Sequence, residues 1–468
     1  SSELTHGLSS IINMNKHQDT IVALATAPGI GAIGIIRISG TNAFPIVNGL
    51  FPNKDLNIQK THTIHYGHFL KNNQILDEVV VSLFKGPQSY TKEDVIEISC
   101  HGSPYIIQKV IETLIDSGAR LAKPGEFTQR AFLNGRFDLA QAEAVADLIA
   151  SENETAHQAA INQMRGGFSA EIKKLREELI HFASMIELEL DFGEEDVEFA
   201  NRKELKSLIK EIQEVIQGLI ESFRLGNVIK KGIPTVIAGK PNSGKSTLLN
   251  ALLNEEKAIV SDVPGTTRDL IEDEIILDGI PFRFIDTAGI RATEDQVEAI
   301  GVARTHIKMQ EASVLLYLID LKNDSLSTYK EQLYSLEKQK VPFIIVANKL
   351  DEADEFLKTH IQADDRAVLI SAASKTNLEI LKSKLIRVLD ITEFKNSNTI
   401  VTNVRHYEGL IQAKDAIQEV LKGIANNITH DFLAADIRQS LHALGEITGE
   451  ITNDDLLKNI FSKFCIGK

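Results

Sequence analysis

The sequence has little of what marks a secreted or membrane protein. Only two cysteines, Cys100 and Cys465, occur among 468 residues, which argues against a disulfide scaffold and fits a reducing compartment. No apolar run approaches the roughly 20 residues that a membrane-spanning helix needs. The N-terminal residues show no basic start followed by an apolar segment, so we expect no secretory signal. We therefore predict a cytoplasmic protein.

Basic residues are outnumbered by acidic ones. The chain has 50 lysines and arginines against 65 aspartates and glutamates, and its formal net charge is −15. A protein that binds RNA without a partner usually has a basic surface patch. This balance counts mildly against such a protein, although it is compatible with a local basic patch. The acidic stretch 187–199 is interpreted as a solvated helix end and loop.

The pattern of apolar and polar residues changes along the chain and predicts a multidomain α/β protein. Short apolar runs separated by Gly, Pro and Asn come first and indicate an α+β domain. Helical periodicity follows, then apolar strands alternating with polar helical stretches, the pattern of a parallel sheet covered on both faces. The predicted parts are an N-terminal domain (1–137), a helical domain in two segments (138–230 and 391–468), and an α/β domain inserted between them (231–390).

The segment GKPNSGKST (239–247) fits the phosphate-binding pattern G-x-x-x-x-G-K-[ST]. It follows an apolar strand and precedes a helical stretch, which is the context that the motif requires. Its glycines let backbone N–H groups approach the phosphates. Lys245 would neutralise charge on the β- and γ-phosphates, and the Ser246 hydroxyl would bind Mg²⁺.

Three further motifs follow in the order expected of a GTPase, each at the end of a strand. Asp286 occupies the place of a water-bridged Mg²⁺ ligand, and the Gly289 N–H can meet the γ-phosphate. In NKLD (348–351), Asp351 can accept hydrogen bonds from guanine that adenine cannot offer, and such a site rejects the wrong base by roughly 10⁴–10⁵. The backbone of SAA (371–373) can donate to the guanine O6.

The segment IVSDVPGTTRD (259–269) lies between the first two motifs, and its Thr267 is the natural switch threonine that closes onto Mg²⁺ and the γ-phosphate. The full set of predicted GTP-binding residues is Asn242, Ser243, Gly244, Lys245, Ser246, Thr247, Ser261, Asp262, Val263, Pro264, Gly265, Thr266, Thr267, Asp286, Thr287, Ala288, Gly289, Asn348, Lys349, Asp351, Ser371, Ala372 and Ala373.

From about Asp19 to Lys468 the chain resembles the MnmE family (also called TrmE), the bacterial tRNA-modification GTPases. The segments that carry the resemblance are GIIRISG (34–40), PGEFTQRAFLNGRFDLAQAEAVADLI (124–149), GKPNSGKSTLLN (239–250), GTTRD (265–269), DTAGIR (286–291) and FCIGK (464–468).

The resemblance bears on how GTP would be hydrolysed. Ile290 follows DTAG where Ras-like enzymes carry a water-orienting glutamine. The family is implied to use K⁺ near the α- and γ-phosphates, doing the work of an arginine finger, with G domains paired across the nucleotides. Glu298 is implied to position the water; without the resemblance it reads as a solvated helix carboxylate. The implied K⁺ ligands are the Asn242 side chain and the carbonyls of Ser261, Val263 and Thr266.

The N-terminal domain carries GIGAIG (29–34), which reads formally as G-x-G-x-x-G. A dinucleotide fingerprint must open a helix, yet the following IGIIRIS alternates like a strand, so we do not predict NAD binding. The resemblance implies instead a site for a tetrahydrofolate derivative (5-formyl- or 5,10-methylene-tetrahydrofolate), with cations for its glutamyl carboxylates and a carboxylate for its pterin. The implied residues are Arg37, Glu97, Arg136 and Lys468; the alternative is surface charges without a ligand.

The C-terminal CIGK superficially resembles a prenylation box, but its glycine and terminal lysine argue against one. The resemblance implies that this tail folds back toward Arg37 and brings Cys465 near the folate. Two roles for Cys465 stay open: it is either a nucleophile or a packed structural cysteine.

Taken together, the resemblance implies a homodimeric GTP hydrolase, with dimerisation through the N-terminal domain. With a FAD-dependent partner of the MnmG (GidA) type, it would add a carboxymethylaminomethyl or aminomethyl group at C5 of the wobble uridine (position 34) of certain tRNAs. The tRNA would be held largely through the complex. The alternative is a regulatory GTPase switch in ribosome assembly or signalling without modification chemistry. A third hypothesis, that the chain is a stand-alone folate-dependent tRNA methyltransferase, is weakened because its sequence shows no flavin-binding fingerprint.

Overall fold

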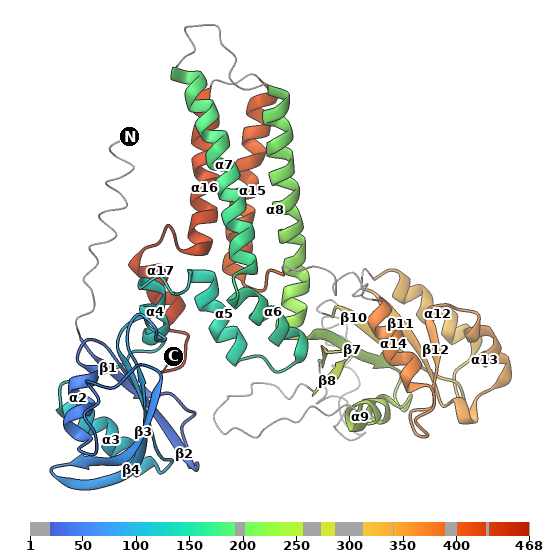
Figure 1. Cartoon of the computed structure of the whole chain (residues 1–468). Coiled ribbons are helices and arrows are strands. Elements are labelled where there is room, and N and C mark those ends of the chain that lie inside the picture. Colours follow the sequence, from blue (N-terminus) through green and yellow to red (C-terminus); the bar gives the residue numbers. More distant parts are fainter. Residues whose placement is uncertain are drawn as a thin grey trace. The chain divides into compact units, whose positions relative to one another are not determined.

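A computed structural model describes residues 19–191, 202–255, 273–285, 312–339, 341–388, 400–426 and 430–467. Figure 1 shows the course of the chain through helices and two separate sheets. The chain forms two compact units, one comprising Ser1–Ala146, Met164–Glu177 and Leu441–Lys468, the other Asp147–Gln163 and Glu178–Ser440. This architecture confirms the predicted multidomain α/β class. None of the described helices is both long and apolar enough to cross a membrane.

The first unit is built on a six-stranded sheet with the order β3-β4-β5-β2-β1-β6. Its neighbouring strands are antiparallel except for the parallel pair β1–β6. The strands are β1 (Ile21–Leu24), β2 (Ile33–Ser39), β3 (Thr63–Lys71), β4 (Gln74–Phe84), β5 (Val95–His101) and β6 (Arg120–Leu121). The strand predicted after GIGAIG is confirmed, because β2 begins at Ile33.

Strand alternation decides which side chains of this sheet face its core. Ile36 and Ile38 of β2 join Ile96 and Ile98 of β5 in a buried cluster that includes residues of two helices, α2 (Ala43–Leu50) and α3 (Pro104–Asp116). Because side chains alternate along a strand, the intervening residues Arg37 and Glu97 point to the other face. The two are direct cross-strand partners in the register of β2 and β5.

Helices and the C-terminal tail complete the first unit. They include α4 (Glu126–Leu133), the start of α5 (Leu139–Ile149), and α17 (Asp454–Phe461). Leu139 and Ala142 of α5 share a buried cluster with Leu457 and Phe461 of α17 and with Phe464. Residues far apart in the sequence therefore form one core.

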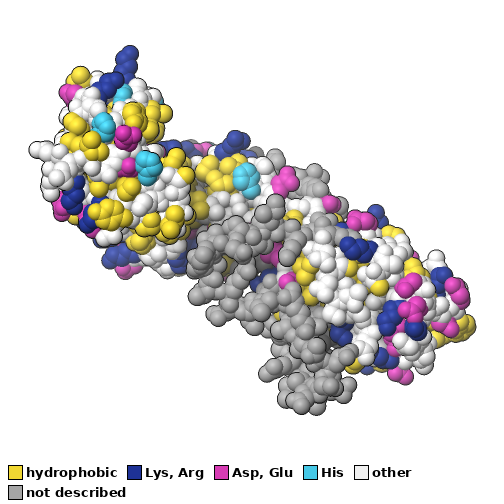
Figure 2. All heavy atoms as spheres, turned by 90° about the horizontal axis from the view of Figure 1, so that it is seen from below, with side chains coloured by type: hydrophobic (Ala, Val, Ile, Leu, Met, Phe, Trp, Pro, Cys, Tyr) yellow, Lys and Arg dark blue, Asp and Glu magenta, His cyan; other side chains and the backbone are white. Residues whose placement is uncertain are grey.

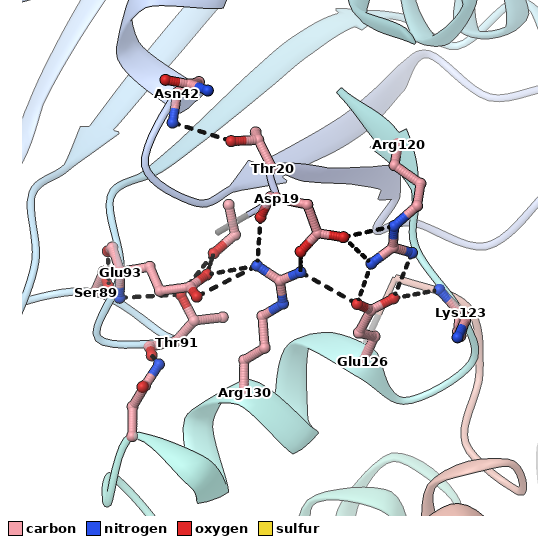
Figure 3. Close-up of polar contacts among 12 residues, drawn as sticks. Asp19, Thr20, Asn42, Ser89, Thr91, Glu93, Arg120, Lys123, Glu126 and Arg130 are labelled. Carbon is pink, nitrogen blue, oxygen red and sulfur yellow. Dashed lines mark hydrogen bonds and ion pairs between the residues drawn. The ribbon is translucent and has the colours of Figure 1, made fainter. Parts of the chain in front are cut away.

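A buried arginine ties three segments of the first unit together (Figure 3). The Arg130 side chain of α4 is only 1% exposed and donates to Asp19 at 2.7 Å, to Glu93 at 3.2 Å and to Glu126 at 3.2 Å. Arg120 lies on the far side of the same acids and pairs with Asp19 and Glu126 at 2.7 and 2.6 Å. The network joins the residue before β1, the loop before β5 and helix α4.

This network predicts that the first unit loses stability in acid. Burial alone would raise the pKa of Asp19 and of Glu126, but their bonds to Arg120 and the charge of Arg130 outweigh it and leave both pKa values below 3.8 and 4.5, respectively. A carboxyl whose pKa is lower in the folded state stabilises the fold above its unfolded pKa and loses that contribution as pH falls. We expect hydrogen exchange of β1 and α4 to accelerate progressively below about pH 4.5. Exchange rates that ignored pH there, after correction for intrinsic chemistry, would contradict this.

Further helices lie between the two sheets in the sequence and after the second sheet. They are α6 (Glu154–Met164), α7 (Gly167–Asp191), α8 (Arg202–Lys231), α15 (Val404–Ala425) and α16 (His430–Thr448). In α8 the buried residues Ile209, Ile212 and Ile216 recur at helical spacing, which makes one apolar stripe. Phe223 of α8 stacks on Tyr407 of α15 with ring centroids 4.3 Å apart, so these two helices lie side by side.

The second sheet has the order β12-β11-β10-β7-β9-β8, and only its β8–β9 pair is antiparallel. Separate buried clusters cover its two faces, as the continuous apolar strands predict. The strands are β7 (Ile233–Gly239), β8 (Asp273–Leu277), β9 (Ile280–Phe284), β10 (Val314–Asp320), β11 (Phe343–Asn348) and β12 (Ala367–Leu369). The helices are α9 (Lys245–Glu255), α12 (Leu326–Glu337), the 3₁₀ helix η1 (Leu350–Glu352), α13 (Glu355–Gln362) and α14 (Leu378–Val388).

The strand order reverses at β7, which has β9 on one side and β10 on the other. In open parallel sheets a ligand binds in the crevice outside the carboxyl ends of the strands at such a reversal. The loop that leaves β7 is GKPNSGKST, so the topology puts the predicted phosphate-binding loop at this position.

Candidate functional site

The phosphate-binding loop runs from the end of β7 at Gly239 to the start of α9 at Lys245. Asn242 has a left-handed backbone with φ of 59°, which asparagine tolerates better than most residues. Gly244 is required on steric grounds, because a Cβ there would lie 2.3 Å from the Asn348 amide nitrogen. The loop opens a helix whose first turn carries Ser246, as an anion-binding N-terminus should.

One buried amide joins three of the predicted motifs. Asn348 is 3% exposed, and its Nδ2 donates to the Ser243 carbonyl at 2.9 Å. Its Oδ1 accepts from the Ala372 backbone N–H at 3.0 Å. Both ends of the amide are therefore bound within the protein, so Asn348 positions the loops around it. Since the Ala372 N–H is engaged, the Ala373 N–H is the better donor for a guanine O6.

Two charged groups brace the loop from the side of β10 and β11. Lys349 has a left-handed backbone, and its ammonium donates to the Asn242 carbonyl at 3.0 Å and to Asp320 at 2.7 Å. Burial alone would raise the pKa of Asp320, but the bonds from Lys349 and Asn323 lower it below 3.8. Sequence reasoning missed Asp320, although it ends a strand at the same sheet edge as the motifs that were found.

Asp351 is ionised, as a carboxylate that accepts hydrogen bonds from guanine must be. It lies in η1, where a hydrogen bond with the Ser371 side chain lowers the pKa of its carboxyl below 3.8. The group is exposed and ionised at neutral pH, so it can accept two N–H groups from a base. Ser371 belongs to the SAA motif, which brings the two predicted base-recognition segments together.

The phosphate-binding lysine lies over its own loop. Lys245 Nζ donates to the carbonyls of Gly239 at 3.0 Å and Lys240 at 2.7 Å, and burial lowers its pKa. Ser246 and Thr247 beside it are exposed. The described part of the loop thus offers a cation, two hydroxyls and a helix N-terminus to a polyphosphate.

A second site lies in the first unit, where Arg37, Glu97 and Arg136 line one cavity of about 750 Å³. Arg37 donates to Glu97 Oε1 from Nε at 2.9 Å and from Nη2 at 2.8 Å. The guanidinium carbons of Arg37 and Arg136 each lie 5.0 Å from the Tyr90 ring centroid. Arg136 also donates to the Ser89 carbonyl at 2.6 Å. Three residues predicted from distant segments therefore converge.

Comparison with known proteins gives a consistent family. The family model for the MnmE helical domain matches residues 139–465, and that for the GTP-binding protein TrmE N-terminus matches 20–136. A protein of Cytophaga hutchinsonii named tRNA modification GTPase MnmE is 58% identical over 98% of this chain and its own full length. One of Flavobacterium johnsoniae with the same name is 55% identical over 97% of this chain and its full length. The chain belongs to the MnmE family.

A solved structure, the FeoB G-domain from Methanococcus jannaschii, matches 34% of this chain and 98% of that chain. The identity is 23% and the TM-score is 0.24, which is too low to carry an argument.

The tail of this MnmE family member lies against the cavity. The Gly467 carbonyl is 3.5 Å from Arg37 Nη1, and the Cys465 carbonyl accepts from the Gly125 N–H at 3.4 Å. Cys465 itself is exposed, which disfavours a packed structural role. Cys100 is buried, and burial with the nearby Asp77 charge raises the pKa of its thiol to about 11. Cys100 is therefore a poor nucleophile at neutral pH.

Several predicted positions lie outside the described residues and stay predictions. They are Ser261, Asp262, Val263, Pro264, Gly265, Thr266, Thr267, Asp286, Thr287, Ala288, Gly289, Glu298 and Lys468.

Sequence reasoning also missed residues of the cavity wall, among them Tyr90 and Lys92. Both belong to a polar stretch between two strands, which reads as an ordinary loop. The one available signal was an aromatic residue with a lysine shortly after it, a few residues before Glu97.

Proposed function

We propose that this chain is a K⁺-dependent GTP hydrolase that takes part in tRNA wobble uridine modification. With a FAD-dependent partner of the MnmG (GidA) type, it would add an aminomethyl or carboxymethylaminomethyl group at C5 of uridine 34 in certain tRNAs. Full-length relatives named tRNA modification GTPase support the GTPase and tRNA parts. The observation that carries the GTPase activity is the Asn348 amide, which joins the phosphate-binding loop to the guanine motifs.

Two described residues, Ser246 and Asn242, offer oxygen ligands for the ions that such a reaction needs, and the other proposed ligands lie outside the described residues. No group of three or more acidic, histidine or cysteine side chains suited to a metal occurs in the described ranges. We propose that Mg²⁺ is held by the Ser246 hydroxyl, by Thr267 and by the nucleotide phosphates. Asn242 would hold K⁺, with carbonyls of Ser261, Val263 and Thr266. K⁺ there supplies positive charge where negative charge develops on the phosphates.

The cavity around Arg37 fits a reduced folate. Both Arg37 contacts reach Oε1 of Glu97, which leaves Oε2 able to accept from a pterin amino or ring N–H group. Tyr90 lines the same cavity, and Arg136 offers a partner for a glutamyl carboxylate. A pure regulatory switch needs no such convergence, so this cavity favours modification chemistry over the switch.

Exposed apolar residues support a homodimer through the first unit. Hydrophobic side chains gather on its surface in Figure 2. Ile64 and Tyr66 of the edge strand β3 are 69% and 66% exposed. Large exposed apolar surfaces commonly mark interaction sites. We propose that a second copy of the chain covers this exposed apolar surface in the dimer.

The K⁺ requirement can be tested by GTP turnover in KCl against NaCl at equal ionic strength. We expect turnover in KCl to be faster by roughly tenfold or more, since an arginine finger is worth about 10³–10⁵. Asn242→Ala should remove most of the difference. Asn250→Ala, which changes an exposed asparagine of α9, should keep it. Equal slow rates in both salts would refute the K⁺ site and assign the missing catalytic group to the partner.

A further inference from the structure

Lys92 occupies an unusual position at the wall of the Arg37 cavity. It lies in the loop between β4 and β5, and its φ is 60°, in the left-handed region that glycine adopts without strain. Its ammonium donates to the Gly135 carbonyl at 2.7 Å. A lysine held in a backbone conformation that favours glycine suggests that its side chain is useful there.

The positive charge of Lys92 adds to that of Arg136. Lys92 reaches the carbonyl of Gly135, the residue directly before Arg136, and both side chains line the same cavity. Within the described ranges neither forms an ion pair with a carboxylate, and each donates to a backbone carbonyl instead. Arg37 by contrast is paired with Glu97, the one carboxylate among the lining residues. The cavity wall therefore carries two cations whose charge no lining acid balances.

We propose that Lys92 and Arg136 form a subsite for a polyanionic tail, so that the cavity prefers tetrahydrofolates carrying several γ-linked glutamates. The inference rests on the proposed folate site and extends it from the ring system to the tail. Each added glutamate brings one more carboxylate, and a tail anchored at its first residue keeps the next ones at high local concentration. Exposed ion pairs are individually weak and are screened by salt. The preference should therefore be modest, cumulative and salt-sensitive.

The test compares the dissociation constants of 5-formyl-tetrahydrofolate with one and with three glutamates, using the full-length chain. We expect the triglutamate to bind about three- to tenfold more tightly at low ionic strength. The difference should shrink toward unity near 1 M salt, where the Debye length is about 3 Å.

Lys92→Gly is the informative variant, because it removes the ammonium and also relieves the left-handed backbone. It should therefore fold normally, bind the monoglutamate almost as the unaltered chain does, and lose most of the triglutamate preference. Lys92→Arg should retain the preference. Lys375→Gly is the matched control, since Lys375 belongs to the other unit and has a φ of 59°. It should change neither affinity.

The outcomes separate this inference from the folate proposal. Equal binding of the two ligands by the unaltered chain would overturn the polyanion subsite and leave the folate site standing. Binding of neither ligand would overturn the folate site and the subsite with it. A preference that survives in Lys92→Gly would also overturn the inference. So would a Lys92→Gly variant that loses affinity for tRNA while its glutamate preference is unchanged, because the polyanion would then be RNA phosphate.

Discussion

Replacing Arg130 with methionine is expected to destabilise the first unit by about 3–5 kcal/mol. The guanidinium is fully enclosed and bonds three carboxylates, of which the Glu126 side chain is only 5% exposed. Methionine fills a similar volume but removes the cation that Glu93 contacts, and it leaves Asp19 and Glu126 with Arg120 alone. Removing one partner of a buried ion pair leaves uncompensated charge, which costs far more than the pair gains by forming.

The loss can be measured by urea-dependent hydrogen exchange on peptides from β1 and α4, which resolves the first unit within a chain of several parts. Arg366→Met is the matched control. Arg366 belongs to the other unit, its side chain is 42% exposed, and it pairs with Asp364 and Glu337. Its replacement, measured on peptides from α12 and β12, should cost less than about 1 kcal/mol. Equal effects of the two variants would show that burial of Arg130 contributes nothing.

Replacing Asp351 with asparagine is expected to turn base preference from guanine toward xanthine, with the ratio of GTP to XTP affinity falling by roughly 10⁴. The carboxylate accepts two N–H groups from guanine. Xanthine has a carbonyl in place of the amino group, and an asparagine amide can donate to it. The lowered pKa of Asp351 means that the carboxylate acts in its charged form near neutral pH.

Competition of GTP and XTP for the purified chain measures this ratio. Asp354→Asn provides the control, because Asp354 is three residues away and caps α13 by accepting from the Leu357 N–H. That variant should lose a little stability and keep the preference for guanine. An unchanged preference in Asp351→Asn would remove Asp351 from the base site.

The α/β segment was predictable because its signals are local. A run of apolar residues followed by GKPNSGKST specifies a strand, a loop and a helix, and the described motifs NKLD and SAA each follow a strand of the same sheet. The first unit was predicted less completely. Strand β3, with its histidines, Tyr66 and Gly67, has no clean alternation of apolar residues, so only its neighbours were anticipated.

The unpredicted parts of the sites depend on tertiary neighbours. The double role of the Asn348 amide requires Ser243 and Ala372 to meet it, and those residues lie far away in sequence. Arg130 looks like an exposed helix residue in FTQRAFL until Asp19 and Glu93 are brought against it. Tyr90 likewise becomes recognisable as a site residue only in the folded structure, where Arg37 and Arg136 both approach its ring. Sequence spacing alone does not predict which of these side chains come into contact in the folded protein.

The core that α17 and Phe464 share with α5 also constrains the order in which the chain can mature on the ribosome. The first 146 residues emerge early, but their unit is completed by residues 441–468. At a synthesis rate of about 5–20 residues per second, the gap lasts on the order of half a minute. During that interval the apolar surface that awaits Leu457 and Phe461 is uncovered. Nascent chains are therefore expected to engage chaperones at the N-terminal unit, and ribosomes stalled before residue 441 should yield a unit that lacks this shared core.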